Sequence, residues 1–324
     1  MSRRRPGEFE VIARYFTPPV RHTVLAGGDD AALVRVRAGC DLAVSTDLLL
    51  EGRHFFRGAD PRRLGHKALA VNLSDMAAMG AAPRWATLAI ALPQADTRWL
   101  AAFARGFIGL ARRFDVDLVG GDTTRGPLAI CVQIMGEVPR GAALTRAGAR
   151  PGDDVWLSGR TGEAALAVAL RGGRLRLLAP RLHAACERRL DLPEPRVALG
   201  LALRGVASAA IDVSDGLLAD LGHIAERSAV SAVVECERVP RAPAVRGCDS
   251  QTVAEAALLG GGDDYELCFT APPRARLRVE GIARRLRLPL TRIGRIERGT
   301  AGKVTVTRGG RAFAPPGRGF DHFG

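Results

Sequence analysis

The sequence contains almost no lysine. Lysine occurs only at positions 67 and 303, so arginine supplies the other 45 of the 47 basic residues. The formal charge is +13, and a basic protein of this kind could bind nucleic acid, an anionic membrane or an anionic small molecule. Aromatic residues make up only 5% of the 324 residues, and this scarcity disfavours a protein that stacks single-stranded bases. We interpret most of the charge as a preference for arginine on solvated faces.

Cysteine motifs and long apolar segments are also missing. The six cysteines lie at 40, 131, 186, 236, 248 and 268, and no two form a C-x-x-C pair. This spacing disfavours a zinc ribbon or a redox motif and is typical of reduced thiols in the cytoplasm. The basic residues 3–5 precede no apolar stretch, so we expect no signal peptide. The longest apolar runs are far shorter than a membrane span. We therefore predict a cytoplasmic protein that binds neither membrane nor nucleic acid.

The common nucleotide and nucleophile motifs do not occur. The chain has no G-x-x-x-x-G-K-[ST], no G-x-G-x-x-G and no G-x-S-x-G. An ATP-using enzyme with this sequence would need another way to hold the phosphates.

Strand-like and helix-like segments alternate along the chain, which predicts a mixed α/β fold. We expect strands in "CDLAVSTD", "RWATLAIAL" and "LAICVQIMGEV", and helices over residues 61–80 and 96–115. A segment rich in Gly, Ala, Pro and Arg at residues 139–152 is the expected linker. We therefore predict two α/β domains, residues 1–140 and 141–324. The similar stretches "VSTDLLLEGRHF" and "DVSDGLLADLGHI" raise the hypothesis of a repeated strand-then-acidic-turn unit.

Aspartates are the main candidates for chemistry, and most follow glycines or a short apolar run. In "KALAVNLSDMAAMGAAP", Asn72 and Asp75 share one face of an otherwise apolar helix. A buried carboxylate is costly unless it is paired or binds a metal. Oxygen ligands without a His or Cys cluster favour Mg²⁺, which binds phosphates as well. The set is Asp29, Asp30, Asp47, Asp75, Asp122, Asp212, Asp215, Asp263 and Asp264.

Eight stretches together resemble the thiamine-monophosphate kinase family, in the family's order and over nearly the whole chain. They are "GEFEVIARYF", "GDDAALV", "VSTDLLLEGRHF", "GHKALAVNLSDMAAMGAAP", "GGDTTRGP", "TRAGARPGD", "DVSDGLLADLGHI" and "GGGDDYELCFT". Relatives with the same fold include aminoimidazole ribonucleotide synthetase, selenophosphate synthetase and a hydrogenase maturation protein. This chain lacks both the reactive cysteine in a Gly-rich N-terminal loop expected of selenophosphate synthetase and the C-terminal cysteine of the hydrogenase protein.

The resemblance implies an activity and an architecture. The activity is transfer of the ATP γ-phosphoryl group to thiamine monophosphate, with several Mg²⁺ ions and without a phospho-enzyme. The implied N-terminal domain binds ATP and Mg²⁺ and forms a β-barrel shared by a homodimer. The implied C-terminal domain packs against it and completes the active-site cleft. The acceptor is already an ionised phosphate, so no general base or covalent nucleophile is expected.

The resemblance also assigns residues. Metal-ligand positions match Asp30, Ser45, Thr46, Asp47, Asp75, Asp122, Asp212 and Asp215. Nucleotide-phosphate contacts match Gly121, Asp122, Arg146 and Ser214, and substrate contacts match His54, Asp263 and Phe320. Asp263 stands where many relatives have Glu. The family's adenine-contacting aromatic is not matched, because residue 104 is Ala and Phe103 would point elsewhere.

Two other functions stay open at this point. One is another ATP-using activity of the same superfamily. The other is a basic nucleic-acid-binding protein whose Asp residues are simple turns, which would bind with a steep salt dependence. Carboxylates gathered in one site would repel nucleic-acid phosphates unless a metal intervened.

Overall fold

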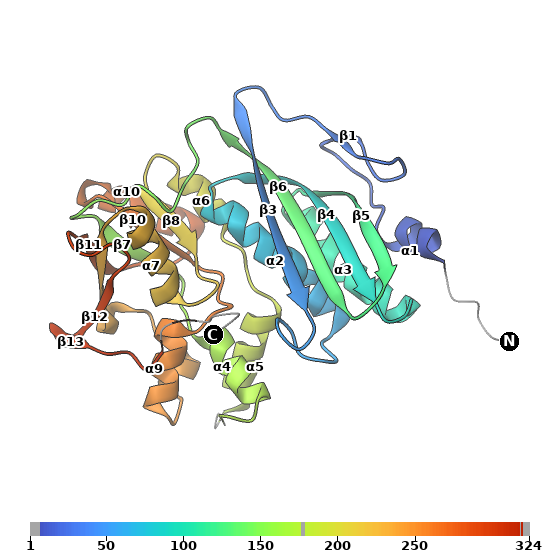
Figure 1. Ribbon diagram of the computed structural model, residues 1–324. Helices are drawn as coiled ribbons and strands as arrows, with labels where there is room; N and C mark the ends of the chain where they lie inside the picture. Colours follow the sequence, from blue (N-terminus) through green and yellow to red (C-terminus); the bar gives the residue numbers. More distant parts are fainter. Residues whose placement is uncertain (1–6, 176–178, 318, 320–324) are drawn as a thin grey trace. The chain divides into compact units, whose positions relative to one another are not determined.

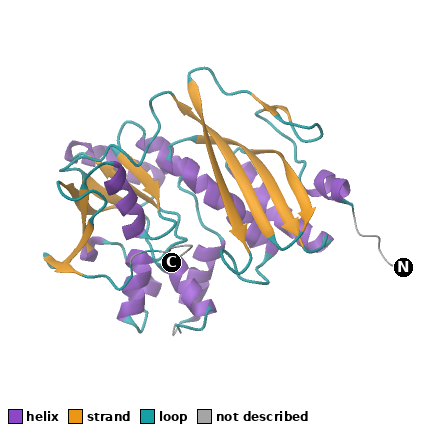
Figure 2. Cartoon of the chain, in the orientation of Figure 1, coloured by secondary structure: helices purple, strands orange, loops and turns teal. Residues whose placement is uncertain are grey.

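The computed structural model describes residues 7–175, 179–317 and 319 (Figures 1 and 2). The chain divides into two compact units, which are described separately below. The first unit spans Met1–Met76 and Ala81–Gly141, and the second spans Ala77–Gly80 and Ala142–Gly324. In the described part of the chain, none of the helices combines the length and apolarity needed to cross a bilayer.

The first unit is a four-stranded sheet with two long helices on one face. The strand order is β3-β6-β4-β5, in which β4 and β5 are parallel and the other pairs antiparallel. A short hairpin and a short helix precede the sheet. The elements are α1 (Glu8–Tyr15), β1 (Thr23–Leu25), β2 (Leu33–Val34), β3 (Cys40–Leu50), α2 (Pro61–Ala78), β4 (Ala82–Leu92), α3 (Thr97–Arg113), β5 (Asp117–Arg125) and β6 (Ala129–Pro139).

The two faces of this sheet differ in burial. Residues alternate between faces along a strand, so Leu88, Ile90 and Leu92 of β4 are buried on the helix face. On the other face Val44 and Leu48 of β3 are each 52% exposed. This open face is apolar. Among the described residues β3 and β5 each pair with one strand only, so the sheet has two edges and forms no closed barrel in the single chain.

Close packing of α2 against α3 depends on two glycines. A Cβ on Gly106 of α3 would lie 1.9 Å from the Arg62 carbonyl oxygen, and one on Gly65 of α2 would lie 2.2 Å from the Phe103 carbonyl oxygen. Each helix therefore needs a residue without a side chain where the two backbones meet. This contact fixes how closely α2, which carries Asp75, packs against α3.

The second unit is built on a seven-stranded mixed sheet, in the order β13-β12-β9-β11-β7-β10-β8. All residues of β7, β8 and β10 are buried, as in strands with both faces covered. The strands are β7 (Asp154–Ser158), β8 (Ala209–Asp212), β9 (Ser231–Glu235), β10 (Leu267–Ala271), β11 (Leu290–Glu297), β12 (Val304–Arg308) and β13 (Arg311–Phe313). The α-helices are α4 (Glu163–Arg171), α5 (Pro180–Asp191), α6 (Val197–Leu203), α7 (Leu217–Arg227), α8 (Pro243–Arg246), α9 (Gln251–Gly260) and α10 (Arg276–Leu286), with 3₁₀ turns η1 (Cys236–Arg238) and η2 (Pro273–Ala275).

The expected mixed α/β class is confirmed, and the strongly periodic segments form the predicted elements. The helix expected over residues 61–80 is α2, and the helix expected over 96–115 is α3, which Asp96 caps by accepting from the Arg98 and Trp99 N–H groups. The repeat hypothesis is wrong. Asp47 lies in the middle of an unbroken β3, whereas Asp212 ends β8 and a turn follows, so the two similar stretches fold differently.

We predict that Gly106→Ala destabilises the first unit by about 1–3 kcal/mol, because the new methyl group meets backbone that cannot move away. Gly109→Ala is the matched control on the same helix, since no atom lies within 4 Å of its added Cβ. That variant should keep or slightly raise stability, because alanine favours helix more than glycine does. Denaturant unfolding measures both variants. Equal stability of the two would contradict the packing argument.

Candidate functional site

Strand β3 and helix α2 bring Ser45 and Asp75 together. The Ser45 Oγ donates to Asp75 Oδ2 at 2.6 Å. Asp47 lies two residues further along β3 and therefore shares the helix-covered face with Ser45. The Asp75 side chain thus lies outside the apolar packing of α2 and faces β3.

Asn72 has a different role from Asp75. Its side chain is fully buried, and its Nδ2 donates to the Ala68 carbonyl oxygen one turn earlier in α2 at 3.0 Å. Its Oδ1 is buried without a hydrogen-bond partner. Asn72 therefore bonds to its own helix and does not contact the Ser45–Asp75 pair through a hydrogen bond.

Thr46 has its side chain on the opposite face of the sheet. Its hydroxyl accepts from Gln133 Nε2 of β6 at 3.4 Å, among the residues of the open face. The Thr46 side chain therefore points away from Ser45 and Asp47, so a contact from Thr46 to a ligand shared with them would use its main-chain oxygen.

Gly121 and Asp122 lie on β5, at the other edge of the sheet from β3. Gly121 has φ +147°, and a Cβ there would lie 1.8 Å from the Leu88 carbonyl oxygen. Only glycine allows β4 and β5 to approach so closely. Asp122 is exposed and pairs in register with Ala89 of β4.

Two further predicted residues of the first unit lie in loops. His54 follows β3 in a turn, where its Nδ1 accepts from the Leu50 N–H at 3.0 Å. Asp30 is exposed between β1 and β2, in the "GGDD" stretch. Phe103 is fully buried and stacks between Trp99 and Phe107, so it is not placed to contact adenine.

In the second unit, Asp212 ends β8, and the turn that follows carries Ser214 and Asp215. One buried carboxylate from α7 holds this turn. Asp220 Oδ2 accepts three consecutive main-chain N–H groups, from Ser214, Asp215 and Gly216, each at 3.1 Å. We did not predict Asp220 from the sequence, although its position four residues after Gly216 at a helix start was a usable signal.

The same turn brings acidic side chains close together. Burial, and then the charges of Asp212 and Asp215, raise the pKa of Asp220 to about 8 against the N–H bonds that lower it. A divalent cation would relieve this repulsion, and oxygen-rich turns of this kind suit Mg²⁺. Over residues 7–175, 179–317 and 319, no three His, Cys, Asp or Glu side chains cluster as a complete metal site. The oxygen donors of Asp212, Ser214 and Asp215 fit Mg²⁺, which commonly uses one or two carboxylates together with water and substrate phosphates.

The loop that carries Asp263 is joined to this turn. The Asp263 N–H donates to the Ser214 carbonyl oxygen and the Tyr265 N–H to the Val213 carbonyl oxygen, both at 2.8 Å. Asp263 has φ +67°, and its Oδ1 accepts from the Tyr265 hydroxyl at 3.0 Å. The structure thus brings the predicted phosphate contact Ser214 and the predicted substrate contact Asp263 together.

Arg146 is exposed in the irregular segment of the second unit that precedes β7, and its carbonyl oxygen accepts from Ser228 Oγ at 3.1 Å. Phe320 lies outside the described residues.

Two buried acids, Asp264 and Glu266, follow Asp263 directly in the chain and anchor its loop to neighbouring segments. Glu266 accepts from Ser158 Oγ at 2.5 Å and from Arg196 at 2.6 and 2.7 Å, and it also pairs with Arg189. Burial alone would raise the pKa of Glu266, but these arginines lower it. Asp264 Oδ2 accepts from the Gly162 N–H at 2.7 Å, while its Oδ1 is buried without a partner. Burial and the Glu266 charge raise the pKa of Asp264 to about 7, against the attraction of Arg189.

We predict that Asp264→Asn changes how stability depends on pH. The raised pKa means that Asp264 favours the fold most below about pH 4, and that this contribution is lost as the pH rises to about 7. Asparagine keeps an acceptor for the Gly162 N–H and does not titrate. The melting temperature of the variant relative to the parent should therefore be higher at pH 8 than at pH 5, measured without Mg²⁺ or nucleotide.

Asp41→Asn, at a side chain that is 60% exposed, serves as the control with the same charge change. The idea fails if Asp264→Asn and the parent differ by the same amount at both pH values.

Comparisons with known proteins show which family this chain belongs to. The chain matches the family models of the AIR synthase related protein N-terminal domain over residues 28–138 and C-terminal domain over residues 150–307. The thiamine-monophosphate kinase of Salmonella typhimurium is 43% identical over 321 residues, covering 98% of both chains. That of Bacillus subtilis is 33% identical over 328 residues, covering 98% of this chain and 99% of its own.

Solved structures agree with these relatives. The crystal structure of thiamine-monophosphate kinase from Stenotrophomonas maltophilia has a TM-score of 0.83 at 49% identity, covering 90% of this chain and 92% of that one. AaThiL complexed with AMPPCP and TMP has a TM-score of 0.74 at 31% identity, covering 91% of each. The chain therefore belongs to the AIR synthase related protein family and, within it, to the thiamine-monophosphate kinases.

Proposed function

We propose that this protein transfers the γ-phosphoryl group of ATP to thiamine monophosphate, giving thiamine diphosphate and ADP. The observation that carries the proposal is similarity over 98% of the chain to a thiamine-monophosphate kinase that is 43% identical. A structural neighbour that binds AMPPCP and TMP supports the same pair of ligands. Oxygen-bearing side chains at the predicted positions in both units give this activity a physical basis.

In the proposed reaction the bond between the γ-phosphorus and the ADP oxygen breaks, and a bond forms to an oxygen of the acceptor phosphate. That oxygen is already ionised near neutral pH, so no side chain needs to remove a proton. The main obstacle is repulsion between two polyanions. Bound Mg²⁺ would neutralise part of this charge. No residue is assigned as a general base or covalent nucleophile.

The residues of this chain would hold and orient the reactants. In the first unit we assign the Mg²⁺ contacts to Asp30, Ser45, Asp47, Asp75 and Asp122 and to a main-chain oxygen of Thr46. In the second unit we assign them to Asp212 and Asp215. Gly121 and Ser214 would approach the nucleotide phosphates with their backbones, and Arg146 would bind phosphate with its guanidinium. His54 and Asp263 would contact thiamine monophosphate.

We further propose a homodimer formed through the first unit. The open face of its sheet presents Leu42, Val44, Leu48 and Leu50, all exposed, beside residues of β6 and β4. The edges β3 and β5 offer unpaired backbone groups, which natural proteins usually cover. A second copy supplies both an apolar face and complementary edges. Two four-stranded sheets joined in this way would close into an eight-stranded barrel.

The strand order suggests that the two copies share each active site. Asp47 on β3 and Asp122 on β5 are separated by three strand spacings, which is about 14 Å. Two carboxylates that bind one Mg²⁺ ion at about 2.1 Å must lie much closer than this. Pairing of β3 from one copy with β5 of the other would bring these two strands side by side. We therefore propose that Asp47 acts with Asp122 of the partner subunit.

The first test is turnover of ATP, Mg²⁺ and thiamine monophosphate, with free thiamine as the control substrate. We expect thiamine diphosphate only from the monophosphate, and we expect Asp75→Asn and Asp212→Asn each to lower kcat by about a hundredfold. Asp60→Asn is the control at the other end of α2, where asparagine can still cap the Arg63 N–H. Full activity of Asp75→Asn would remove that residue from the mechanism, and no product from the parent would refute the function.

The second test mixes two inactive variants. After subunit exchange between Asp47→Asn and Asp122→Asn, half of the dimers are mixed, and a shared site is intact once in each mixed dimer. About a quarter of the parental activity should then return. If both residues of a site come from one chain, every site keeps a defect and activity does not return. Native mass spectrometry confirms that exchange has occurred.

A further inference from the structure

An arm of the first unit, residues 21–37, lies outside the packed core. It contains β1, β2 and the exposed loop with Asp29 and Asp30. Its apolar residues Val24 and Leu33 are 58% and 54% exposed, so apolar burial contributes little to holding it. The arm runs beside β5, where an added Cβ on Gly27 would lie 3.8 Å from the Val119 carbonyl oxygen. Other contacts must therefore fix its position.

The start of the arm is held by Asp117, the first residue of β5. This carboxylate is only 4% exposed and accepts from three consecutive residues of the arm. The donors are the Arg21 N–H at 2.8 Å, the His22 N–H at 2.6 Å and the Thr23 hydroxyl at 2.8 Å. The Trp85 indole N–H also donates to the His22 carbonyl oxygen at 3.2 Å.

The end of the arm is held by Glu137 of β6, which is 2% exposed. Glu137 accepts from the Arg37 N–H at 2.7 Å and from Arg37 Nε at 2.6 Å. Burial alone would raise the pKa of Glu137, but these bonds and Arg84 hold it below its ordinary value. Glu137 is therefore ionised at neutral pH, and a buried charge without its donors would be costly.

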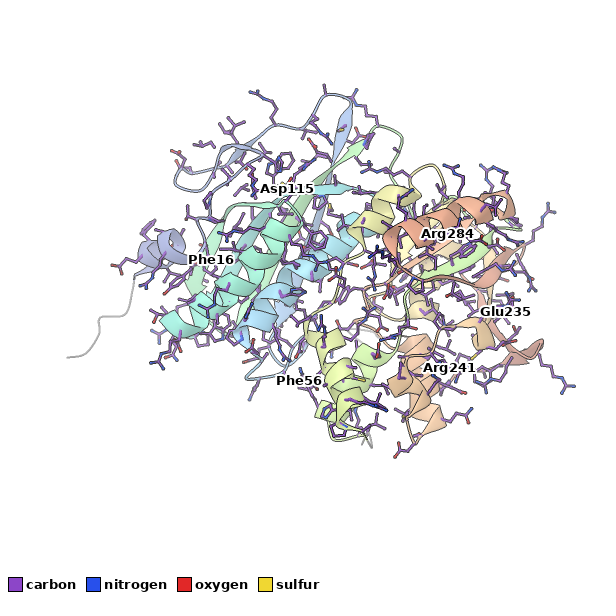
Figure 3. The ribbon with its side chains drawn as sticks, turned by 180° about the vertical axis from the view of Figure 1, so that it is seen from behind. Phe16, Phe56, Asp115, Glu235, Arg241 and Arg284 are labelled. Atoms are coloured by element: carbon purple, nitrogen blue, oxygen red, sulfur yellow. The ribbon has the colours of Figure 1, made fainter. Side chains whose placement is uncertain are left out.

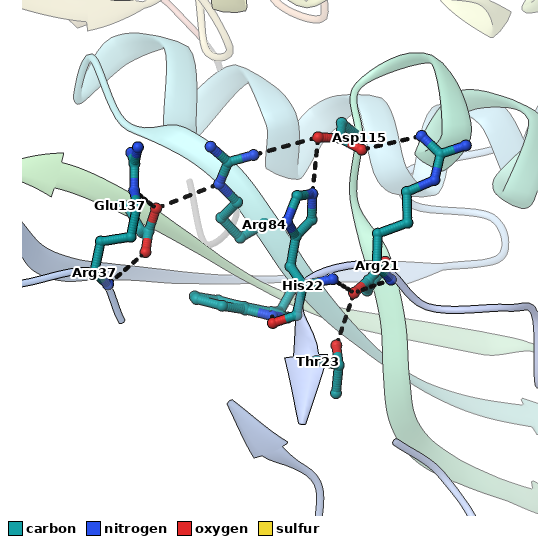
Figure 4. Close-up of polar contacts among 9 residues, drawn as sticks. Arg21, His22, Thr23, Arg37, Arg84, Asp115 and Glu137 are labelled. Carbon is teal, nitrogen blue, oxygen red and sulfur yellow. Dashed lines mark hydrogen bonds and ion pairs between the residues drawn. The ribbon is translucent and has the colours of Figure 1, made fainter. Parts of the chain in front are cut away.

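Arg84 of β4 connects the two attachments (Figure 4). Its Nε pairs with Glu137 and its Nη1 with Asp115, each at 3.3 Å. Asp115 in turn pairs with His22 Nε2 at 2.8 Å and Arg21 Nη1 at 3.3 Å. Figure 3 shows Asp115 from behind, just beyond the end of α3. We call Arg84, Asp115, Asp117 and Glu137 the clasp.

We propose that the clasp positions the loop that carries Asp30, by fixing both ends of the arm to one end of the sheet. Its members are positioning residues and would not touch substrate. With both ends fixed, the residues between them have few ways to move, so Asp30 is presented beside β5 without an ordering cost at each binding event. The effect of the clasp on turnover rests on the proposed function, whereas its effect on the mobility of the arm does not.

The test uses Asp117→Asn and Glu137→Gln in the full-length protein. Each variant keeps one acceptor oxygen but turns the other into an N–H donor that faces the arm's own donors. Hydrogen exchange of the amides of residues 21–37 should rise about tenfold, which corresponds to the loss of roughly one such bond. The Mg²⁺ concentration for half-maximal activity should rise several-fold, while the KM for thiamine monophosphate changes less than twofold.

Asp96→Asn is the matched control. Asp96 also accepts backbone N–H groups in the first unit, but at the start of α3 and not from the arm. It should change neither the arm's exchange nor the Mg²⁺ dependence. If Asp117→Asn does not fold, Thr23→Val removes one donor from an arm residue and should raise exchange about threefold.

Unchanged exchange in the arm overturns the proposal, whatever the kinetics. Raised exchange with an unchanged Mg²⁺ dependence also overturns it, because the arm would then be held without positioning Asp30. The exchange measurement needs no substrate, so it reports on the clasp even if the parent protein does not phosphorylate thiamine monophosphate.

Discussion

A carboxylate that leaves water needs donors or a cation, and this constraint organises both units of the protein. Asp117, Glu137, Asp220 and Glu266 are all nearly or fully buried, and each takes its donors from the chain itself. They hold, respectively, the two ends of the arm, the turn after β8 and the base of the Asp263 loop. Among the acids proposed to bind Mg²⁺, Asp30 lies on the arm, and Asp212 and Asp215 lie at the end of β8 and in the turn that follows.

The hydrogen bonds of these buried acids form a local framework around the candidate site. In the second unit the turn with Ser214 and the loop with Asp263 are joined by two backbone bonds of 2.8 Å, and Asp220 fixes the turn from α7. Nucleotide and acceptor contacts would therefore share one local framework. In the first unit, the glycine contact sets how closely α2, the helix that carries Asp75, can approach α3. Positions within such frameworks need little rearrangement when ligands bind.

The arginine bias has a structural counterpart. Arg37 and Arg84 bind Glu137, Arg189 and Arg196 bind Glu266, and Arg171 binds Glu187 and Asp191. Guanidinium groups can satisfy two acceptor oxygens at once, which suits carboxylates that are partly or wholly buried. Several of the arginines thus form ion pairs with acidic side chains of the same unit.

Local pattern was enough to predict the class of fold and the longest elements, because apolar periodicity acts over neighbouring residues, as in α2 and α3. Resemblance to a family supplied the site residues by position. Neither could predict that β3 and β5 are opposite edges, or that Asp117 and Glu137 hold backbone from distant segments. Those facts depend on strand order, register and burial, which arise only when residues far apart in the sequence pack together, as Arg37 and Glu137 do across 100 positions.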